Sequence, residues 1–170
     1  MQLAAKGDEC AFEALVQRHQ GGVVRFLIQA GAVQDAVDLA QETFIRVYHH
    51  RHHYRPEAKF TTYLYTIARH VLIDYVRKRN RQPEVADDVI PEHVPAREQE
   101  PEGTAIDIEE ALANLSERLR LVIVLRVMEG FTAEETAEIL DVPVGTVKSR
   151  LHLGFRELRK HLGVYEQEYR

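Results

Sequence analysis

A length of 170 residues allows one ordinary domain or two small ones, and 45% hydrophobic with 29% charged residues argues against a disordered or fibrous chain. The single cysteine excludes an internal disulfide framework, and the lack of a long apolar run or a signal peptide predicts a cytoplasmic protein without membrane insertion. The net charge of −5 hides an uneven distribution, because basic stripes at 69–81 and 148–160 flank an acidic stretch at 82–110.

The pattern of apolar residues in the first half of the chain, residues 1–81, predicts four helices. Asp8 is expected to cap the first, and Cys10 to be a small buried residue near its start. A second helix is expected from about Val23 to Ala30, where Gly31 ends it. A third helix is expected from about Asp35. Its inward-facing residues are predicted to be Val37, Ala40, Phe44, Ile45 and Tyr48.

The fourth helix is expected from about Thr61 to Arg81 and combines an apolar face with a basic end. Its predicted buried residues are Leu64, Ile67, Ala68, Val71, Leu72 and Tyr75. Aromatic residues lie at or just before its start, namely Tyr54, Phe60, Tyr63 and Tyr65. Aromatic rings beside a cationic track hold the unstacked bases of a single strand, so one or two of these rings are predicted to stack on bases, with Phe60 in the core.

Residues 82–107 are predicted to be an acidic linker. Four of the six prolines fall there, and the segment has almost no periodic apolar pattern. Fully extended it would span roughly 85 Å, whereas duplex sites two helical turns apart are separated by roughly 70 Å. A mostly extended linker could therefore bridge two such sites.

Residues 108–163 are predicted to form a domain with a helix-turn-helix unit. A short tail at 164–170 follows it. Ile108 to Leu115 and a helix capped by Ser116 come first, and the latter stops near Gly130. Thr132-Ala-Glu-Glu135 is a capping-box pattern that opens a helix to Leu140. A turn leads to a long helix from about Val144 to Leu162, in which Val147 and Leu151 are expected to face the core.

The outward face of that last helix carries the predicted duplex contacts. In a helix-turn-helix, the N-terminal residues of the second helix enter the major groove. Hydroxyl and cationic side chains suit phosphate oxygens and guanine edges. The predicted DNA contacts on this helix are Thr146, Lys148, Ser149, Arg150, His152 and Arg156.

Three motifs together resemble the extracytoplasmic-function (ECF) sigma factors of bacterial RNA polymerase. They are Asp38-Leu-Ala-Gln-Glu-Thr-Phe44, then Phe60-Thr-Thr-Tyr-Leu-Tyr-Thr-Ile-Ala-Arg69 with Asp74-Tyr-Val-Arg-Lys78, and Pro143-Val-Gly-Thr-Val-Lys-Ser-Arg-Leu151. The resemblance covers nearly the whole chain in the right order. It implies an all-α protein of two small helical domains that directs promoter-specific initiation and has no enzymatic activity, cofactor or small-molecule substrate.

The resemblance also implies partners and site residues. Core RNA polymerase is expected to be bound at its β′ clamp helices and its β subunit. The residues expected to dock on the clamp helices are Asp38, Gln41, Glu42 and Phe44. The residues expected to melt and read the minus-ten element are Arg55, Lys59, Tyr63, Arg69, His70, Arg77, Lys78 and Arg81. The 144–156 helix would read the minus-thirty-five element as duplex, and an anti-sigma factor is an expected partner.

The chain departs from the family pattern at both DNA-reading helices. Tyr63 stands where the family usually has tryptophan, and His70 where it has asparagine. Leu153 and Phe155 occupy places often filled by arginine. Fewer cations on the reading helix should weaken phosphate contact, so these departures bear on which bases are preferred.

Three other interpretations are weaker. His49 and His53 have the spacing of a metal-ligand pair, but no cysteine or well-placed acidic residue is nearby, so no metal site is predicted. A stand-alone helix-turn-helix regulator would account for 116–162 but would leave the acidic linker and the 60–81 pattern without a purpose. An enzyme is disfavoured because the sequence has no Walker loop, no catalytic triad setting and no paired-carboxylate metal pattern.

Overall fold

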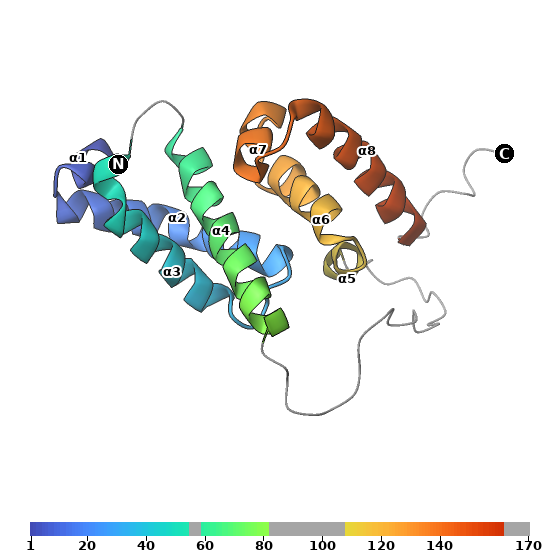
Figure 1. Ribbon diagram of the computed structural model, residues 1–170, viewed down its shortest axis with the longest axis horizontal. Coiled ribbons are helices and arrows are strands. Elements are labelled where there is room, and N and C mark those ends of the chain that lie inside the picture. Colours follow the sequence, from blue (N-terminus) through green and yellow to red (C-terminus); the bar gives the residue numbers. More distant parts are fainter. Residues whose placement is uncertain (55–58, 82–107, 162–170) are drawn as a thin grey trace.

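The computed structural model describes residues 1–54, 59–81 and 108–161 (Figure 1). Within these ranges every regular element is a helix, which confirms the all-α prediction. The elements are α1 (Gln2–Ala5), α2 (Glu9–Gln29), α3 (Ala36–His49), the 3-10 turn η1 (Arg51–His53), α4 (Phe60–Arg81), α5 (Ile108–Ala113), α6 (Glu117–Ile123), the π-helical segment η2 (Val124–Met128), α7 (Ala133–Leu140) and α8 (Val144–His161). None of the described helices is both long and apolar enough to cross a membrane.

Helix α2 begins as predicted but is one helix where two were expected. The Asp8 carboxylate accepts a hydrogen bond from the Ala11 amide at 2.9 Å, which confirms the predicted cap, whereas Cys10 is exposed and not buried. The helix continues through Gly21 and Gly22 without a break. A Cβ atom at Gly22 would lie 2.9 Å from the Tyr65 hydroxyl oxygen, so this glycine permits a close approach of α4.

The buried stripe of α3 is turned relative to the prediction. Val37 and Ile45, expected to face inward, are 58% and 50% exposed. Ala40 and Phe44 are buried as predicted, and the other buried positions are Ala36, Thr43 and Val47. Thr43 is tolerated inside because its hydroxyl donates to the Leu39 carbonyl at 2.7 Å.

The C-terminal half contains the predicted helix-turn-helix. Thr132 and Glu135 form the expected capping box, with bonds of 3.1 Å and 2.8 Å. Asp141 adopts a left-handed conformation (φ 52°) and turns the chain into α8. Val147 is fully buried and Leu151 half-buried, as predicted for the core face.

The preceding helix stops just before Gly130, as expected, but its last turns are π-helical, which was not predicted. Ser116 stands at the N-cap of α6 but its side chain makes no capping bond. After Ile123 the helix widens into the π-helical segment η2, closed by bonds from the Glu129 amide to the Val124 carbonyl and from the Phe131 amide to the Leu125 carbonyl. Such widened turns often mark functional positions. This one presents Glu129 and Phe131 toward the N-terminal half.

Gly154 allows α8 to lie close against α6. A Cβ atom at residue 154 would lie 2.7 Å from the Cδ1 atom of Ile123 and 3.8 Å from the Cβ atom of Leu119. We expect Gly154→Val to lower the free energy of unfolding by about 1–3 kcal/mol, because an overpacked core must shift its side chains. Gly145→Val is the matched control, since a Cβ there meets no described atom within 4 Å. Denaturant unfolding that finds equal losses for both variants would contradict this packing role.

The two halves share one hydrophobic core. Helix α4 lies between the other N-terminal helices and the C-terminal half, where it contacts α7 (Figure 1). Buried residues from both halves join in a single cluster, including Phe26 and Leu64 on one side and Leu125 and Ile139 on the other. Nothing in the periodicity of either half indicated this contact, because it joins residues that are distant in sequence.

Candidate nucleic-acid interface

Helix α8 presents a polar face opposite its core face. Of the six predicted duplex contacts, Lys148, Ser149, His152 and Arg156 are exposed, and Thr146 and Arg150 are half-buried. The core face is anchored by Val147, whose exposure is 0%. The capped α7 and the turn at Asp141 therefore place these polar side chains on one helix, five of them in its first half and Arg156 further along.

The basic side chains of this face are largely uncommitted. Within the described ranges, the side chains of Lys148, Arg150 and His152 make no hydrogen bond or ion pair, while that of Arg156 lies 3.7 Å from the Glu157 carboxylate. The Ser149 hydroxyl donates to the Thr146 carbonyl at 3.1 Å, so its remaining capacity is as an acceptor. Side chains with free donors can bind phosphate oxygens or the acceptor atoms of guanine.

The two family departures on α8 lie in different surroundings. Leu153 is half-buried against the small cluster formed by Leu112, Leu115, Leu119 and Ile123. Phe155 is 45% exposed and lies on the surface. Leu153 therefore contributes to the packing of α8 on α5 and α6. The sequence comparison alone had indicated only a missing cation at this position.

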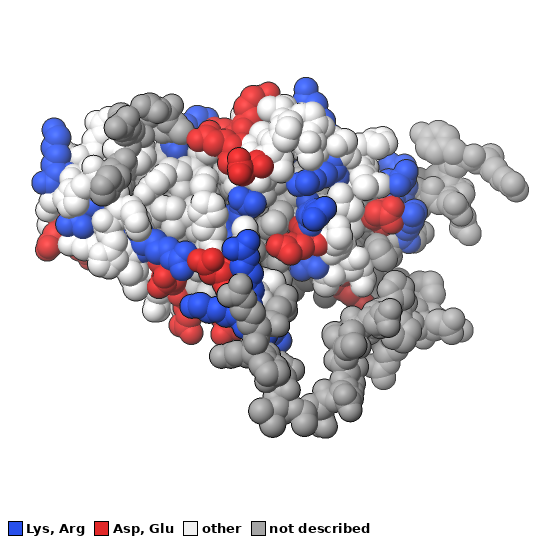
Figure 2. All heavy atoms as spheres, in the orientation of Figure 1, with Lys and Arg blue, Asp and Glu red and all other residues white. Residues whose placement is uncertain are grey.

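The predicted single-strand contacts that the structure describes lie on α4 or, for Lys59, just before it, and two of them touch the C-terminal half. The Lys59 ammonium lies 2.8 Å from a Glu135 carboxylate oxygen, and the Arg69 guanidinium donates to the Ile139 carbonyl at 3.3 Å. His70, Arg77 and Lys78 are exposed along the rest of the helix. Figure 2 shows cationic side chains on this side of the molecule over both halves, interleaved with acidic ones. Arg55 and the side chain of Arg81 lie outside the described residues.

The aromatic residues at the start of α4 divide into two groups. Tyr54, Phe60 and Tyr63 form one cluster, with ring centroids 5.3 Å apart for Tyr54 and Tyr63 and 6.2 Å apart for Tyr54 and Phe60. Burial and the neighbouring Tyr54 raise the pKa of Tyr63, so its hydroxyl stays neutral and can donate a hydrogen bond. Tyr65 is only 5% exposed and is therefore a core residue in this structure, not a surface on which a base could stack.

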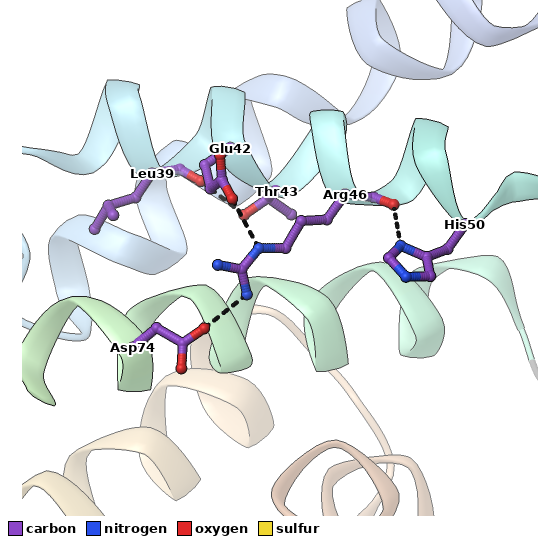
Figure 3. Close-up of polar contacts among 6 residues, drawn as sticks. All are labelled: Leu39, Glu42, Thr43, Arg46, His50 and Asp74. Carbon is purple, nitrogen blue, oxygen red and sulfur yellow. Dashed lines mark hydrogen bonds and ion pairs between the residues drawn. The ribbon is translucent and has the colours of Figure 1, made fainter.

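The third predicted surface, on α3, is built around Arg46 (Figure 3). Its guanidinium binds Glu42 on the same helix and Asp74 on α4, each at 2.8 Å. These hydrogen bonds raise the pKa of Arg46, and the bond from Arg46 lowers the pKa of Asp74. Asp38 and Gln41 are exposed on the same helix. Phe44 is only 7% exposed, so in this structure its ring belongs to the core and not to the surface.

Low pH should reduce the stability of the fold, because two carboxylates that form ion pairs become protonated. Arg46 holds the pKa of Asp74 below its ordinary value, and Lys59 does the same for Glu135. The unfolded chain therefore takes up protons first, so this stabilisation is complete above about pH 5 and is lost as pH falls through the lowered folded-state pKa. We expect the melting temperature to decrease as the pH is lowered from about 5. The decrease should be less steep in the Asp74→Asn variant. Identical slopes in the two proteins would refute the role of Asp74.

The histidine cluster at 49–53 is held by backbone contacts. The Nδ1 atom of His50 is 2.9 Å from the Arg46 carbonyl, and that of His52 is 2.9 Å from the Ala5 carbonyl. His49 is exposed, and the side chain of His53 lies outside the described residues. Within the described part of the chain, no group of three potential ligands gathers there or elsewhere.

Two protein-family models match this chain in the order that the motifs indicated. The model of Sigma-70 region 2 matches residues 15–82, which contain α3 and α4. The model of Sigma-70 region 4 matches residues 105–158, which contain the helix-turn-helix. The exposed faces described above therefore lie within these two regions.

Solved structures agree with this organisation. The sigma factor RpoE from Bartonella quintana, in complex with the anti-sigma factor NepR, aligns with a TM-score of 0.76 and 26% identity over 91% of this chain and 98% of that one. CnrH, in complex with the cytosolic domain of CnrY, aligns with a TM-score of 0.72 over 95% of this chain and 94% of that one. At 22% identity, the second likeness concerns the fold alone.

Curated relatives extend the match to nearly the full chain. The ECF RNA polymerase sigma factor SigE of Mycolicibacterium smegmatis is 35% identical over 96% of this chain and 67% of its own length. SigW of Bacillus subtilis is 34% identical, and the alignment covers 92% of this chain and 91% of SigW. The ECF sigma-E factor of Escherichia coli is 33% identical over 86% of this chain and 83% of its own length. The chain therefore belongs to the ECF family of RNA polymerase sigma factors.

Proposed function

We propose that this protein binds core RNA polymerase and directs it to promoters, reading the minus-thirty-five element with α8 and the minus-ten element with α4. The observation that carries the proposal is the polar face of α8, where Lys148, Arg150 and His152 have no partner among the described residues. Uncommitted lysine, arginine and histidine side chains near the start of a helix-turn-helix recognition helix suit base edges and phosphates. The protein would act in the cytoplasm, without catalysis of its own.

The proposed minus-ten contacts lie along one side of α4 and at its start. Tyr63 belongs to an aromatic cluster at the N-terminal end of the helix, and the exposed His70, Arg77 and Lys78 follow toward its C-terminal end. Aromatic rings followed by a cationic track fit a strand whose bases have been unstacked. The departures at Tyr63 and His70 would then set which bases are accepted.

The proposed polymerase contact lies on α3. Asp38 and Gln41 are exposed there, and Glu42 is oriented by its bond to Arg46. Arg46 also donates to Asp74 on α4, so this guanidinium links the docking helix to the minus-ten helix. Docking of α3 on the polymerase would therefore also position α4.

We also propose an anti-sigma factor as a partner. The solved RpoE structure that covers 91% of this chain contains the anti-sigma factor NepR. A partner of that kind could clamp the two small helical domains. Co-purification from the native host, followed by identification of the bound chain, would test this.

Reconstituted transcription tests the proposed function. Core polymerase would be supplied with a randomised promoter library, with and without the protein, and transcripts with defined start sites counted. We expect such transcripts only when the protein is present. If no promoter is used while the isolated protein binds duplex DNA tightly, the chain acts as a stand-alone helix-turn-helix regulator and the proposal is wrong.

A further inference from the structure

A small apolar pocket lies between the end of α2 and the helices α5 and α6, and its volume is about 250 Å³. Its lining is mostly aliphatic, with Ile28 and Val33 from the N-terminal half and Ile108, Leu112 and Met128 from the C-terminal half. Pockets that bind small molecules combine such a lining with a few polar groups, and those for drug-sized ligands span roughly 300–1,000 Å³. The pocket therefore suits a smaller ligand.

Among the described residues that line the pocket, Arg120 alone carries a charge. Its Nη2 atom donates to the carbonyls of Ala113 and Leu115, at 3.0 Å and 2.9 Å, at the end of α5. Its Nη1 atom lies beside the backbone of Gly31, where a Cβ atom would be only 2.6 Å away. The guanidinium is thus fixed at the pocket by contacts with both halves.

The charge of Arg120 has no counterion among the described residues. The Nε atom is buried without a hydrogen-bond partner, and no described carboxylate forms an ion pair with this side chain. Burial lowers the pKa of Arg120, and Glu117 opposes that effect. An arginine nevertheless stays protonated at neutral pH. A half-buried cation in apolar surroundings attracts an anion more strongly than a solvated one does.

A second polar group of the pocket is also without a partner. The side-chain oxygen of Gln29 is buried and accepts no hydrogen bond. No bond therefore prevents this amide from turning its NH₂ group toward an acceptor. A carboxylate has two acceptor oxygens, so it could receive hydrogen bonds from both Arg120 and Gln29.

We infer that this pocket binds a small monocarboxylate with an apolar body, such as a medium-chain fatty acid. The carboxylate would lie on Arg120, and the hydrocarbon would pack against Ile28, Leu112 and Met128. A nucleotide or sugar phosphate is a poor fit, because its many polar groups would be buried there without partners. None of these residues is a proposed DNA or polymerase contact, so the site does not depend on the proposed function.

The two methionines of the chain provide a local test of binding. Met128 lines the pocket, whereas Met1 lines a separate hollow whose arginine, Arg18, is exposed. The full chain would be labelled with ¹³C at the methionine methyl groups, and octanoate, octanol and octylamine would be added in separate NMR titrations. We expect octanoate to shift the Met128 signal to saturation, to leave that of Met1 in place, and to bind about tenfold or more tighter than octanol or octylamine.

Two results of these titrations would overturn the inference. One is the absence of a Met128 shift with octanoate. The other is equal binding of octanoate and octanol, or equal shifts at Met128 and Met1, because either would show an apolar surface without selectivity for a carboxylate.

Variants at the pocket separate charge from apolar contact. Arg120→Gln should weaken octanoate binding about tenfold or more and leave octanol binding unchanged. Val33→Asp and Val33→Lys are a matched pair, because Val33 is 66% exposed at the rim and both changes remove the same side chain while the bonds of Arg120 to α5 remain. We expect octanoate to bind the lysine variant about threefold tighter than the aspartate variant, and octanol to bind both equally. Undiminished octanoate binding in Arg120→Gln, or equal octanoate affinities in the Val33 pair, would overturn the inference.

Discussion

Replacing Phe26 with alanine is expected to lower the free energy of unfolding by about 3–5 kcal/mol, a large part of the stability of a protein of this size. Phe26 has 0% exposure on α2, and its ring lies 5.2 Å from that of Tyr65. The substitution removes a ring from the centre of the shared core and leaves a cavity. The surrounding helices cannot move in to fill it, because each packs against other helices as well.

Phe155→Ala is the matched control for this prediction. The chemical change is the same, but Phe155 is 45% exposed on α8, so the loss should stay within about 0.5 kcal/mol. Both variants would be unfolded in denaturant and followed by circular dichroism. Equal losses would mean that Phe26 is not at the centre of the core.

Replacing Arg150 with alanine is expected to weaken recognition of one minus-thirty-five base pair by about 1–3 kcal/mol, or about 5- to 150-fold. Arg150 is half-buried near the start of α8 and has no ion pair within the described ranges. A guanidinium so placed can donate two hydrogen bonds to one guanine. The loss should therefore appear at one position of the element and not at the others.

The measurement is the affinity of holoenzyme for a set of promoters, each changed at one base pair. Arg159→Ala removes an exposed cation further along α8 and should weaken all promoters slightly and equally. If Arg150→Ala also weakens every promoter equally, Arg150 binds a phosphate and does not read a base.

Local features of the fold could be predicted because their signals lie within a few residues. The Asp8 cap and the Thr132–Glu135 capping box each depend on residues three apart, and both are present. The helix break expected before Val23 was wrong. A glycine can end a helix or can allow another helix to approach closely, and at Gly22 the close neighbour is Tyr65 of α4, which local sequence does not identify. The π-helical segment η2 was likewise not predicted, and Glu129 just after it meets Tyr65 of another helix.

Those parts of the candidate site that lie within a single helix could be predicted from the sequence. The polar face of α8 followed from the buried Val147, and the exposed His70, Arg77 and Lys78 follow from the apolar face of α4. The contacts between the halves were not predicted. Charge pairs such as Lys59 with Glu135 join residues far apart in sequence, and neither residue type nor spacing identifies the partner.

The central claim is that one chain reads two separate promoter elements for RNA polymerase. It is tested most directly by sequencing the promoters that a reconstituted holoenzyme selects from a random library. We predict two conserved blocks at a fixed separation of about two helical turns, with Arg150→Ala relaxing only the upstream block and His70→Ala only the downstream one. A single conserved block, or promoters no different from those used by core polymerase alone, would contradict it.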